Sequence, residues 1–315
     1  MNLIDGVKIS YLCDYSFGDQ SGKFGNVPDH FMKSANLLNL EFVEKVLLND
    51  KKYMTLFIDN IRLYKRKIKN VKPNDRYYVN SLMEENDLLS LCSNFPDTKF
   101  IIFTNLEDTP IDEFIFEKIP ENVLSINAVN ALSFGGKVNP IPYGLQRKLN
   151  HSDNRSEILL EFMSHNNCQI DQLLYVNHSV NTNIEERSGI NELFLDKSWA
   201  KVEVKSVNYI EYLSSLEKSK FMICPIGNAI DCHRNWECLY MRRVPVMKKN
   251  EYLEYLMKDY PVLFVNDYSE ITEELLISNN HLFDEIQKFD LNKLDILNFY
   301  DRIVKNTIKN NDKST

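Results

Sequence analysis

The chain has 315 residues, of which 43% are hydrophobic and 26% are charged, the balance of a folded globular protein rather than a disordered one. Its formal net charge of −8 argues against nucleic acid as the main partner, because binding to a phosphate backbone normally needs a basic face. The length predicts about two domains, each large enough to bury its own core.

The sequence favours a cytoplasmic protein. The first twenty residues contain neither a basic leader nor an apolar run of signal-peptide length, and no stretch approaches the ~20 apolar residues that span a bilayer. The six cysteines lack the regular spacing of a disulfide framework, which favours free thiols in a reducing compartment.

The first half of the chain alternates strand-like and helix-like segments. Residues 7–13 (VKISYLC) predict a first strand, and helical patterning follows over residues 31–48. Further strands are predicted at residues 53–58, 99–104 and 122–126, with a helix near residues 84–92. This alternation is typical of an α/β domain.

A cluster of Pro, Gly and polar residues at positions 140–154 predicts the domain boundary, which gives domains of residues 1–145 and 146–315. The second half repeats the alternation, with strands predicted at residues 173–177, 202–204, 221–224, 244–247 and 261–265. A last amphipathic helix is predicted over residues 291–308, followed by a disordered tail from residue 310.

The most informative stretch, residues 221–248 (FMICPIGNAIDCHRNWECLYMRRVPVMK), has the pattern of strand, loop, helix and strand. Gly227 and Asn228 supply a turn where the backbone can approach a ligand closely. Asp231 is the expected N-cap of the helix, which places Arg234 in the first helical turn.

This arrangement suits a nucleoside diphosphate. A loop that ends at a helix N-terminus presents free N–H groups and the positive end of the helix dipole to a phosphate. Arg234 adds a fork-shaped donor, and His233 beside it adds a further polar contact. Glu237 follows one turn after His233, where a carboxylate can accept both hydroxyls of a ribose.

Each of these residues also has a structural explanation. Arg234 and Glu237 are three residues apart and can pair within the helix, and Asp231 can serve only as its cap. His233 can equally be a satisfied, partly buried histidine.

Three more polar residues follow predicted strands of the second half, where parallel sheets gather ligands. Asn183 and Arg187 come after the strand predicted at residues 173–177, and Asp267 lies just beyond the end of the strand predicted at residues 261–265. All three are candidates for contacts with the bound nucleoside diphosphate. The alternatives are a solvated first-turn arginine, which the local pattern favours for Arg187, and a simple strand-end turn for Asp267.

The same residues carry a resemblance to a known family. The stretch CPIGNAIDCHRNWECLYMRRVPVM (residues 224–247) is similar to the signature of exostosin-like glycosyltransferases. The similarity extends to LLYVNHSVNTNIEERSGI, IPYGLQRK and PVLFVNDYSEIT, at residues 173–190, 141–148 and 261–272. It implies a GT-B fold, with two Rossmann-like domains facing a central cleft and a last helix that packs back across the junction. The implied role of Arg187 is a contact with the donor phosphate.

The resemblance further implies transfer of a sugar from a nucleotide-diphosphate donor, most simply a UDP-sugar, to a hydroxyl of a glycan or glycolipid, as in surface polysaccharide synthesis. The chain contains no Asp-x-Asp, the metal-chelating motif of the other large glycosyltransferase fold. We therefore expect neither a metal ion nor any other cofactor.

The first half holds the candidates for a catalytic base, which an inverting enzyme needs to take the proton of the acceptor hydroxyl. Asp19 lies in the Gly-rich loop after the first predicted strand, and Asp14, His30 and Asp108 compete with it. The basic run at residues 62–72 (RLYKRKIKNVK) is typical of a solvated face, and its alternative is a peripheral contact with an anionic acceptor or membrane.

A second function class fits the same pattern. The resemblance is faint over the first hundred residues, so a catalytically silent nucleotide-sugar-binding protein is the alternative to an enzyme. A dehydrogenase would need a G-x-G-x-x-G after a strand, and the sequence contains none.

Overall fold

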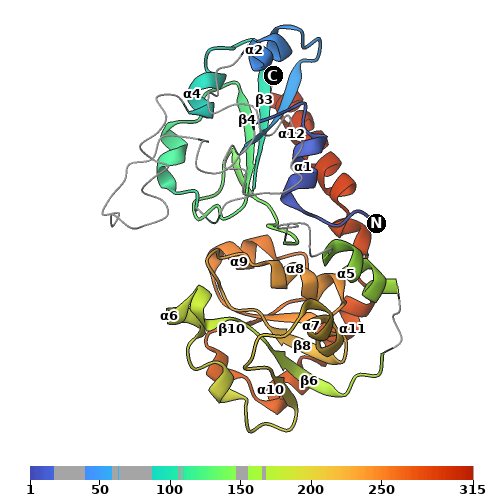
Figure 1. Cartoon of the computed structure of the whole chain (residues 1–315). Coiled ribbons are helices and arrows are strands. Elements are labelled where there is room, and N and C mark those ends of the chain that lie inside the picture. The colour runs from blue at the N-terminus through green and yellow to red at the C-terminus, as the bar shows by residue number, and fades with distance from the viewer. Residues whose placement is uncertain are drawn as a thin grey trace. The chain divides into compact units, whose positions relative to one another are not determined.

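The computed structural model describes residues 1–17, 40–58, 63, 87–105, 108, 110–146, 155–164 and 168–314. Contacts divide the chain into two units. The N-terminal unit comprises residues 2–143, 147–152 and 295–315, and the C-terminal unit comprises residues 1, 144–146 and 153–294. Each unit holds an all-parallel sheet of five strands, which confirms the α/β prediction (Figure 1).

The sheet of the N-terminal unit runs in chain order, β1-β2-β3-β4-β5. Its strands are β1 (Tyr15–Ser16), β2 (Tyr53–Ile58), β3 (Lys99–Thr104), β4 (Val123–Ala128) and β5 (Val138–Pro140). β2 and β3 are buried along all but their first residue, as expected for strands that are covered on both faces, and the one charged residue of the two, Lys99, is the first residue of β3. β5 is an edge strand and ends at Pro140, a residue that only an edge accommodates easily.

The helices of this unit include one that corrects the sequence prediction. They are α1 (Gly6–Leu12), α2 (Leu40–Leu47), α4 (Leu88–Cys92), the 3-10 helix η2 (Glu113–Glu117) and α12 (Ile296–Ser314). The strand predicted at residues 7–13 is wrong, because this segment forms α1. The Asp5 carboxylate accepts a hydrogen bond from the Lys8 N–H at 3.4 Å, a helix-starting contact that the alternating pattern hides.

The last helix belongs to the N-terminal unit, where α12 contacts α1 and β4 (Figure 1). The predicted helix over residues 291–308 is divided between the 3-10 helix η6 (Leu291–Leu294) and α12. The disordered tail predicted from residue 310 is also wrong, since α12 continues to Ser314 and Asp312 accepts hydrogen bonds from Lys52 and Tyr53.

The sheet of the C-terminal unit has the order β10-β9-β8-β6-β7. Its strands are β6 (Gln172–Val176), β7 (Ala200–Val202), β8 (Ser219–Ile223), β9 (Val244–Lys248) and β10 (Leu263–Val265), each within two residues of its predicted start. Numbered along the chain, the order is 2-1-3-4-5, a doubly wound arrangement. The chain adds β7 on one side of β6 and then returns to place β8 on the other side.

Helices surround this second sheet. They are α5 (Arg155–Ser164), α6 (Ile184–Arg187), α7 (Tyr209–Leu216), α8 (His233–Tyr240), α9 (Glu251–Leu256), α10 (Glu273–Ser278) and α11 (Asn280–Lys288), with 3-10 helices η3 (Val180–Thr182), η4 (Asn191–Leu193) and η5 (Tyr268–Glu270). α8 buries Trp236, Leu239 and Tyr240, the apolar face that its sequence predicts.

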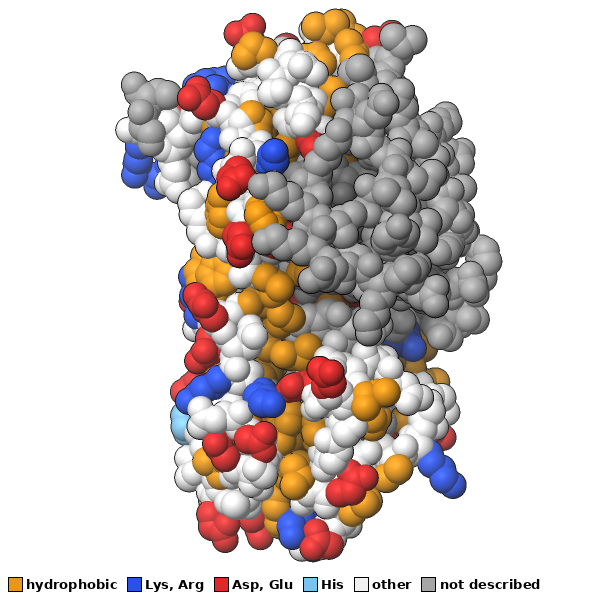
Figure 2. Space-filling model, turned by 90° about the vertical axis from the view of Figure 1, so that its left-hand side faces the viewer, with side chains coloured by type: hydrophobic (Ala, Val, Ile, Leu, Met, Phe, Trp, Pro, Cys, Tyr) orange, Lys and Arg blue, Asp and Glu red, His pale blue; other side chains and the backbone are white. Residues whose placement is uncertain are grey.

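The surface of the C-terminal unit mixes charges of both signs. Figure 2 shows one face, on which acidic and basic side chains are interspersed over the lower part of the view rather than gathered into one patch. In the described part of the chain, no helix combines the length and apolar character that a membrane crossing requires.

Candidate functional site

In the C-terminal sheet, the strand order reverses between β6 and β8, which are hydrogen-bonded neighbours: β7 lies on one side of β6, and β8 to β10 follow on the other. In doubly wound sheets, ligands bind outside the carboxyl ends of the strands at such a reversal. The loops that leave β6 and β8 here are residues 177–183 and 224–232. We call the residues of these two loops, together with those of α6 and the first turns of α8, the switch-point site.

Arg187 joins the two loops of the switch-point site. Its side chain is buried, with 4% of its surface exposed. Nε donates to the carbonyl oxygen of Ile226 at 2.8 Å, and Nη2 donates to that of Pro225 at 2.9 Å. Nη1 donates to the carbonyl oxygen of Ser179 at 2.9 Å and to the Thr182 hydroxyl. The guanidinium therefore clamps the β8 loop to the β6 loop.

The last N–H of the guanidinium faces the Sγ atom of Cys232 at 3.9 Å. Burial raises the pKa of Cys232 to about 11, so this partner is a neutral thiol and a weak acceptor. All five donors of Arg187 thus have partners within the protein. The positive charge of Arg187 would attract a phosphate, but a direct hydrogen bond from its guanidinium to the phosphate would have to displace one of these contacts.

Gly227 makes the clamp possible. A Cβ atom at this position would lie 2.8 Å from Nη2 of Arg187, so a larger residue would push the guanidinium away. The carbonyl oxygen of Gly227 accepts a hydrogen bond from Nδ2 of Asn183 at 3.1 Å, while Oδ1 of Asn183 caps α6 through the N–H of Glu186. Asn228, the next residue of the loop, is exposed.

The start of α8 differs from the sequence prediction. Asp231 is not the N-cap, because that position belongs to Cys232, which makes no side-chain cap hydrogen bond. Asp231 is instead fully buried and accepts hydrogen bonds from Nε1 of Trp236 and Nδ2 of Asn235, each at 2.9 Å. A buried indole N–H needs an acceptor, which explains why the carboxylate turns inward. The N-cap residue itself therefore contributes no side-chain hydrogen bond to the start of α8.

Arg234 lies in the first turn of α8 and is half-buried. Its guanidinium makes no hydrogen bond to any described residue, and its Nε is buried without a partner. Its Cζ lies 5.9 Å from the centre of the Tyr212 ring, a weak cation–π contact. Arg234 is thus a cation with an unused donor in the first turn of a helix whose N-cap side chain makes no hydrogen bond.

Glu237 follows on the same helix with 5% of its surface exposed. Within the described chain it makes no ion pair, so the Arg234–Glu237 pair that the sequence allows does not form. Glu237 lies beside α7, where burial and the charge of Glu237 raise the pKa of Tyr209. Although burial alone would lower the pKa of Arg234, the neighbouring Tyr212 and Glu237 raise it, so the charge of Glu237 acts on Arg234 without a direct ion pair. A buried carboxylate in this position can accept hydrogen bonds from hydroxyl groups.

His233 connects α8 to residues 144–146, which lie in the same unit. Its Nδ1 donates to the carbonyl oxygen of Gly144 at 2.7 Å, and Gly144 has a φ of +74°, a conformation that favours glycine. This hydrogen bond agrees with the alternative that His233 is a satisfied, partly buried histidine, and it orients the imidazole ring at the start of α8.

Three polar residues that the sequence analysis did not single out also lie near the carboxyl ends of the strands. His178 Nδ1, Glu186 Oε1 and the Tyr268 hydroxyl are buried and have no hydrogen-bond partner among the described residues. Buried polar atoms are normally paired, so three unpaired ones in the segments that follow β6 and β10 are candidates for contacts with a ligand. The sequence held one signal that could have identified them as site residues: His178 and Tyr268 follow strands, and Glu186 lies in the helix that follows β6.

Asp267 has the role of a turn residue. It is exposed, and its Oδ1 accepts hydrogen bonds from the N–H and hydroxyl of Ser269 at 3.0 and 2.6 Å, which caps η5. Lys248, the last residue of β9, lies 4.0 Å from Asp267 Oδ2 and 3.5 Å from Glu186 Oε2. Lys248 thus brings one more cation to the same edge of the sheet.

Asp108 is the one member of the predicted catalytic set (Asp19, Asp108 and His30) that the structure describes. It follows β3 at the carboxyl edge of the N-terminal sheet and accepts a hydrogen bond from the Tyr143 hydroxyl at 3.1 Å. Asp19 and His30 lie outside the described residues, as does the basic run at residues 62–72 except for Leu63.

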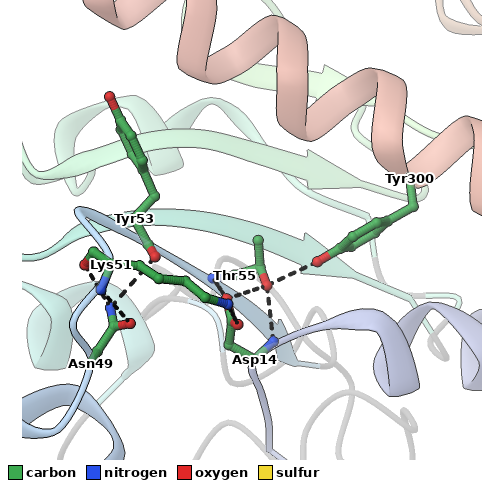
Figure 3. Close-up of polar contacts among 6 residues, drawn as sticks. All are labelled: Asp14, Asn49, Lys51, Tyr53, Thr55 and Tyr300. Carbon is green, nitrogen blue, oxygen red and sulfur yellow. Dashed lines mark hydrogen bonds and ion pairs between the residues drawn. The ribbon is translucent and has the colours of Figure 1, made fainter.

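Asp14, the remaining competitor, lies just before β1, away from the carboxyl ends of the strands. Its Oδ2 accepts hydrogen bonds from the N–H and hydroxyl of Thr55, both at 2.8 Å, and Lys51 Nζ lies 3.0 Å from Oδ1 (Figure 3). Although burial alone would raise the pKa of Asp14, these contacts hold it below its usual value. This arrangement is typical of a structural carboxylate.

Comparison with known proteins identifies no relative: no protein-family model matches the chain, and no curated protein shows significant similarity to it. Among the residues that the structure describes, no group of three or more His, Cys, Asp or Glu side chains is arranged to hold a metal ion.

Proposed function

We propose that this chain is a glycosyltransferase of the GT-B type, similar to the exostosin-like family, whose C-terminal unit binds a nucleotide sugar at the switch-point site. The observation that carries the proposal is Arg234, a half-buried guanidinium in the first turn of α8 that has no hydrogen-bond acceptor among the described residues. A helix N-terminus and an unpaired arginine form a site for an anion, and the reversal of the sheet is where doubly wound units bind nucleotides.

The proposal gives each residue of the site a role. Arg234 and the backbone N–H groups of the loop at Gly227 and Asn228 contact the diphosphate, with His233 next to them. The buried carboxylate of Glu237 accepts the ribose hydroxyls. Arg187 acts through its charge and by holding the loop in place, because its donors already bind carbonyl oxygens.

The remaining predicted contacts support this site from its edges. Asn183 holds the carbonyl of Gly227, Asp231 anchors the start of α8 through Trp236, and Asp267 faces Lys248. These are positioning roles, and they leave the diphosphate contacts to Arg234 and the loop backbone.

The reaction needs charge stabilisation and one proton transfer. The bond between the anomeric carbon and the phosphate oxygen breaks, and the acceptor oxygen forms the new glycosidic bond. Negative charge that develops on the departing diphosphate is stabilised by Arg234, Arg187 and the α8 dipole, so the proposal requires no metal ion. In an inverting reaction, a group of the N-terminal unit removes the proton of the acceptor hydroxyl, and Asp108, Asp19 and His30 are the candidates.

The proposed donor is a UDP-sugar, and the proposed acceptor is a glycan or glycolipid of surface polysaccharide synthesis, in the cytoplasm or at the membrane surface through residues 62–72. These details rest on the resemblance of residues 224–247 to the exostosin-like signature. Nucleic acid is not a proposed partner, since the net charge is −8.

Calorimetry tests the site directly. UDP, GDP, ADP and CMP are titrated in EDTA into the wild type, Arg234→Ala and the control Arg302→Ala, which removes an exposed arginine of α12. One diphosphate should bind the wild type and the control equally, and the Arg234→Ala variant at least tenfold more weakly, or ~1.4 kcal/mol. Equal binding by a folded Arg234→Ala variant, or no binding at all, would refute the assignment.

The matching nucleotide sugar separates the enzyme from the alternative. Hydrolysis or transfer of the sugar supports a glycosyltransferase. Binding without turnover, whatever acceptor is offered, would support a catalytically silent nucleotide-sugar-binding protein.

A further inference from the structure

His178 is a buried histidine of the switch-point site with no role in the contacts described above. It follows β6 by two residues and lies in the loop that Arg187 clamps to the β8 loop. Only 7% of its surface is exposed. Its Nε2 lies 3.3 Å from the backbone carbonyl oxygen of Arg187, and its Nδ1 is buried with no hydrogen-bond partner among the described residues.

The contact of Nε2 identifies the tautomer. A carbonyl oxygen only accepts hydrogen bonds, so Nε2 must carry the proton that it donates to Arg187. Burial, together with the charges of Arg187 and Arg234, lowers the pKa of His178 to about 4, which keeps the ring neutral at pH 7. Nδ1 therefore presents an unprotonated lone pair, a hydrogen-bond acceptor that lacks a donor.

The chemistry of that lone pair restricts its partner. Phosphate oxygens of a diphosphate at neutral pH only accept hydrogen bonds, so they cannot satisfy an acceptor. Hydroxyl groups can donate, and a nucleotide sugar carries them on its ribose and on its transferred sugar. An unpaired acceptor inside a crevice also discriminates strongly, because a ligand without the matching donor leaves it unpaired.

We propose that Nδ1 of His178 accepts a hydrogen bond from a hydroxyl group of the bound nucleotide sugar, on either its ribose or its transferred sugar. The inference rests on the proposed function, since it takes the ligand of the switch-point site to be a nucleotide sugar. His178 then recognises a hydroxyl group in the carbohydrate part of the ligand, while Arg234 binds the phosphate part.

Two substitutions separate the two nitrogens of the ring. In His178→Gln, the side-chain amide reaches the position of Nε2 and can still donate to the Arg187 carbonyl, but nothing replaces the acceptor at Nδ1. In His178→Asn, the shorter amide places its oxygen near the position of Nδ1 and keeps an acceptor there. The Gln variant is therefore the test, and the Asn variant is its matched control.

The experiment measures binding of the nucleoside diphosphate that the wild type selects and of the corresponding nucleotide sugar. We expect His178→Gln to bind the nucleotide sugar about fivefold to tenfold more weakly and His178→Asn to stay within about threefold of the wild type. If the Gln variant also loses the same factor for the diphosphate, the hydroxyl belongs to the ribose. If the diphosphate binds normally, it belongs to the transferred sugar.

Two results overturn the inference while the proposed function stands: a folded His178→Gln variant that binds both ligands like the wild type, or an imidazole ¹⁵N spectrum that shows the Nδ1–H tautomer in the free protein. Failure of the proposed function looks different, because the wild type itself then binds no nucleotide, and the inference falls with it.

Discussion

Two polar clusters of this molecule differ in how completely their atoms are paired. In the Asp14 cluster of the N-terminal unit, the Thr55 hydroxyl donates to Asp14 Oδ2 and accepts from both the Asp14 N–H and the Tyr300 hydroxyl (Figure 3). In the switch-point site, His178 Nδ1, Arg234 Nε and Glu186 Oε1 have no partner among the described residues. A saturated network stabilises a fold, whereas unpaired buried groups destabilise it unless a ligand completes them.

The same difference extends to whole units. Nine buried side-chain polar atoms of the C-terminal unit have no hydrogen-bond partner among the described residues. Charge follows the same division, because Asp14 is neutralised by Lys51, while neither Arg187 nor Arg234 has an ion pair among the described residues. The C-terminal unit thus keeps two arginines without an ion pair among the described residues, whereas the Asp14 cluster of the N-terminal unit is paired internally.

The largest effect on stability should come from Arg187. Arg187→Met keeps much of the side-chain volume but leaves the carbonyl oxygens of Ser179, Pro225 and Ile226 without their donor. We expect the free energy of unfolding to fall by roughly 3 kcal/mol or more, measured in urea. Arg302→Met, at an exposed position, is the control, and a loss below about 1 kcal/mol for Arg187→Met would mean that the clamp is not needed.

Gly227→Ala should come next, because the added Cβ would lie 2.8 Å from Arg187 Nη2 and displace the guanidinium. We expect a loss of about 1–3 kcal/mol in the free energy of unfolding. The matched test is the double variant with Arg187→Met, in which the alanine should have a much smaller additional effect, since only the contact of its Cβ with Cys232 Sγ at 3.2 Å then remains. Additive losses would show that the alanine acts elsewhere.

The saturated cluster should respond to Asp14→Asn with a smaller loss, about 1–2 kcal/mol at pH 7, because the hydrogen bonds to a charged acceptor weaken. The pKa of Asp14 is lowered in the folded protein, so its contribution is present above the unfolded value of 3.8 and is lost as the pH falls through the lower folded value. Unfolding followed from pH 7 to pH 2 should show the wild type and the variant converging at the acid end.

A matched control for this cluster is Asp301→Asn, since Asp301 pairs with Lys305 in an exposed position of α12. Its loss should be only about 0.3–0.5 kcal/mol. Equal effects of the Asp14 and Asp301 substitutions would contradict a structural role for the Asp14 cluster.

Arg234→Ala should change stability least, by no more than about 0.5 kcal/mol, because its guanidinium makes no hydrogen bond to the described residues. Thermal unfolding with and without the nucleotide measures this: the two proteins should unfold alike without ligand, and the ligand should stabilise the wild type more than the variant. A large loss in the apo variant would show that Arg234 is structural, as Arg187 is.

The amino-acid sequence by itself determined where most strands lie, all but the short β1 and β5, and therefore which residues reach the carboxyl edges of the sheets. β2 and β3 have the bounds that the sequence predicts, and each strand from β6 to β10 starts within two residues of its predicted first residue. Such runs identify themselves because a strand covered on both faces excludes charge along its length. The same reasoning placed Arg187, Arg234 and Glu237 near one another, since all follow neighbouring parallel strands.

Only the tertiary structure decided how these residues differ. Arg187 and Arg234 look alike in sequence, each a first-turn arginine after a strand, yet Arg187 has five hydrogen-bond partners and Arg234 has none among the described residues. Asp231 turned from a cap into the acceptor of Trp236, and residues 7–13 formed a helix rather than a strand. A sequence pattern records which side chains are buried, but hydrogen-bond partners come from segments distant in the chain, so only the folded chain shows which polar atoms remain for a ligand.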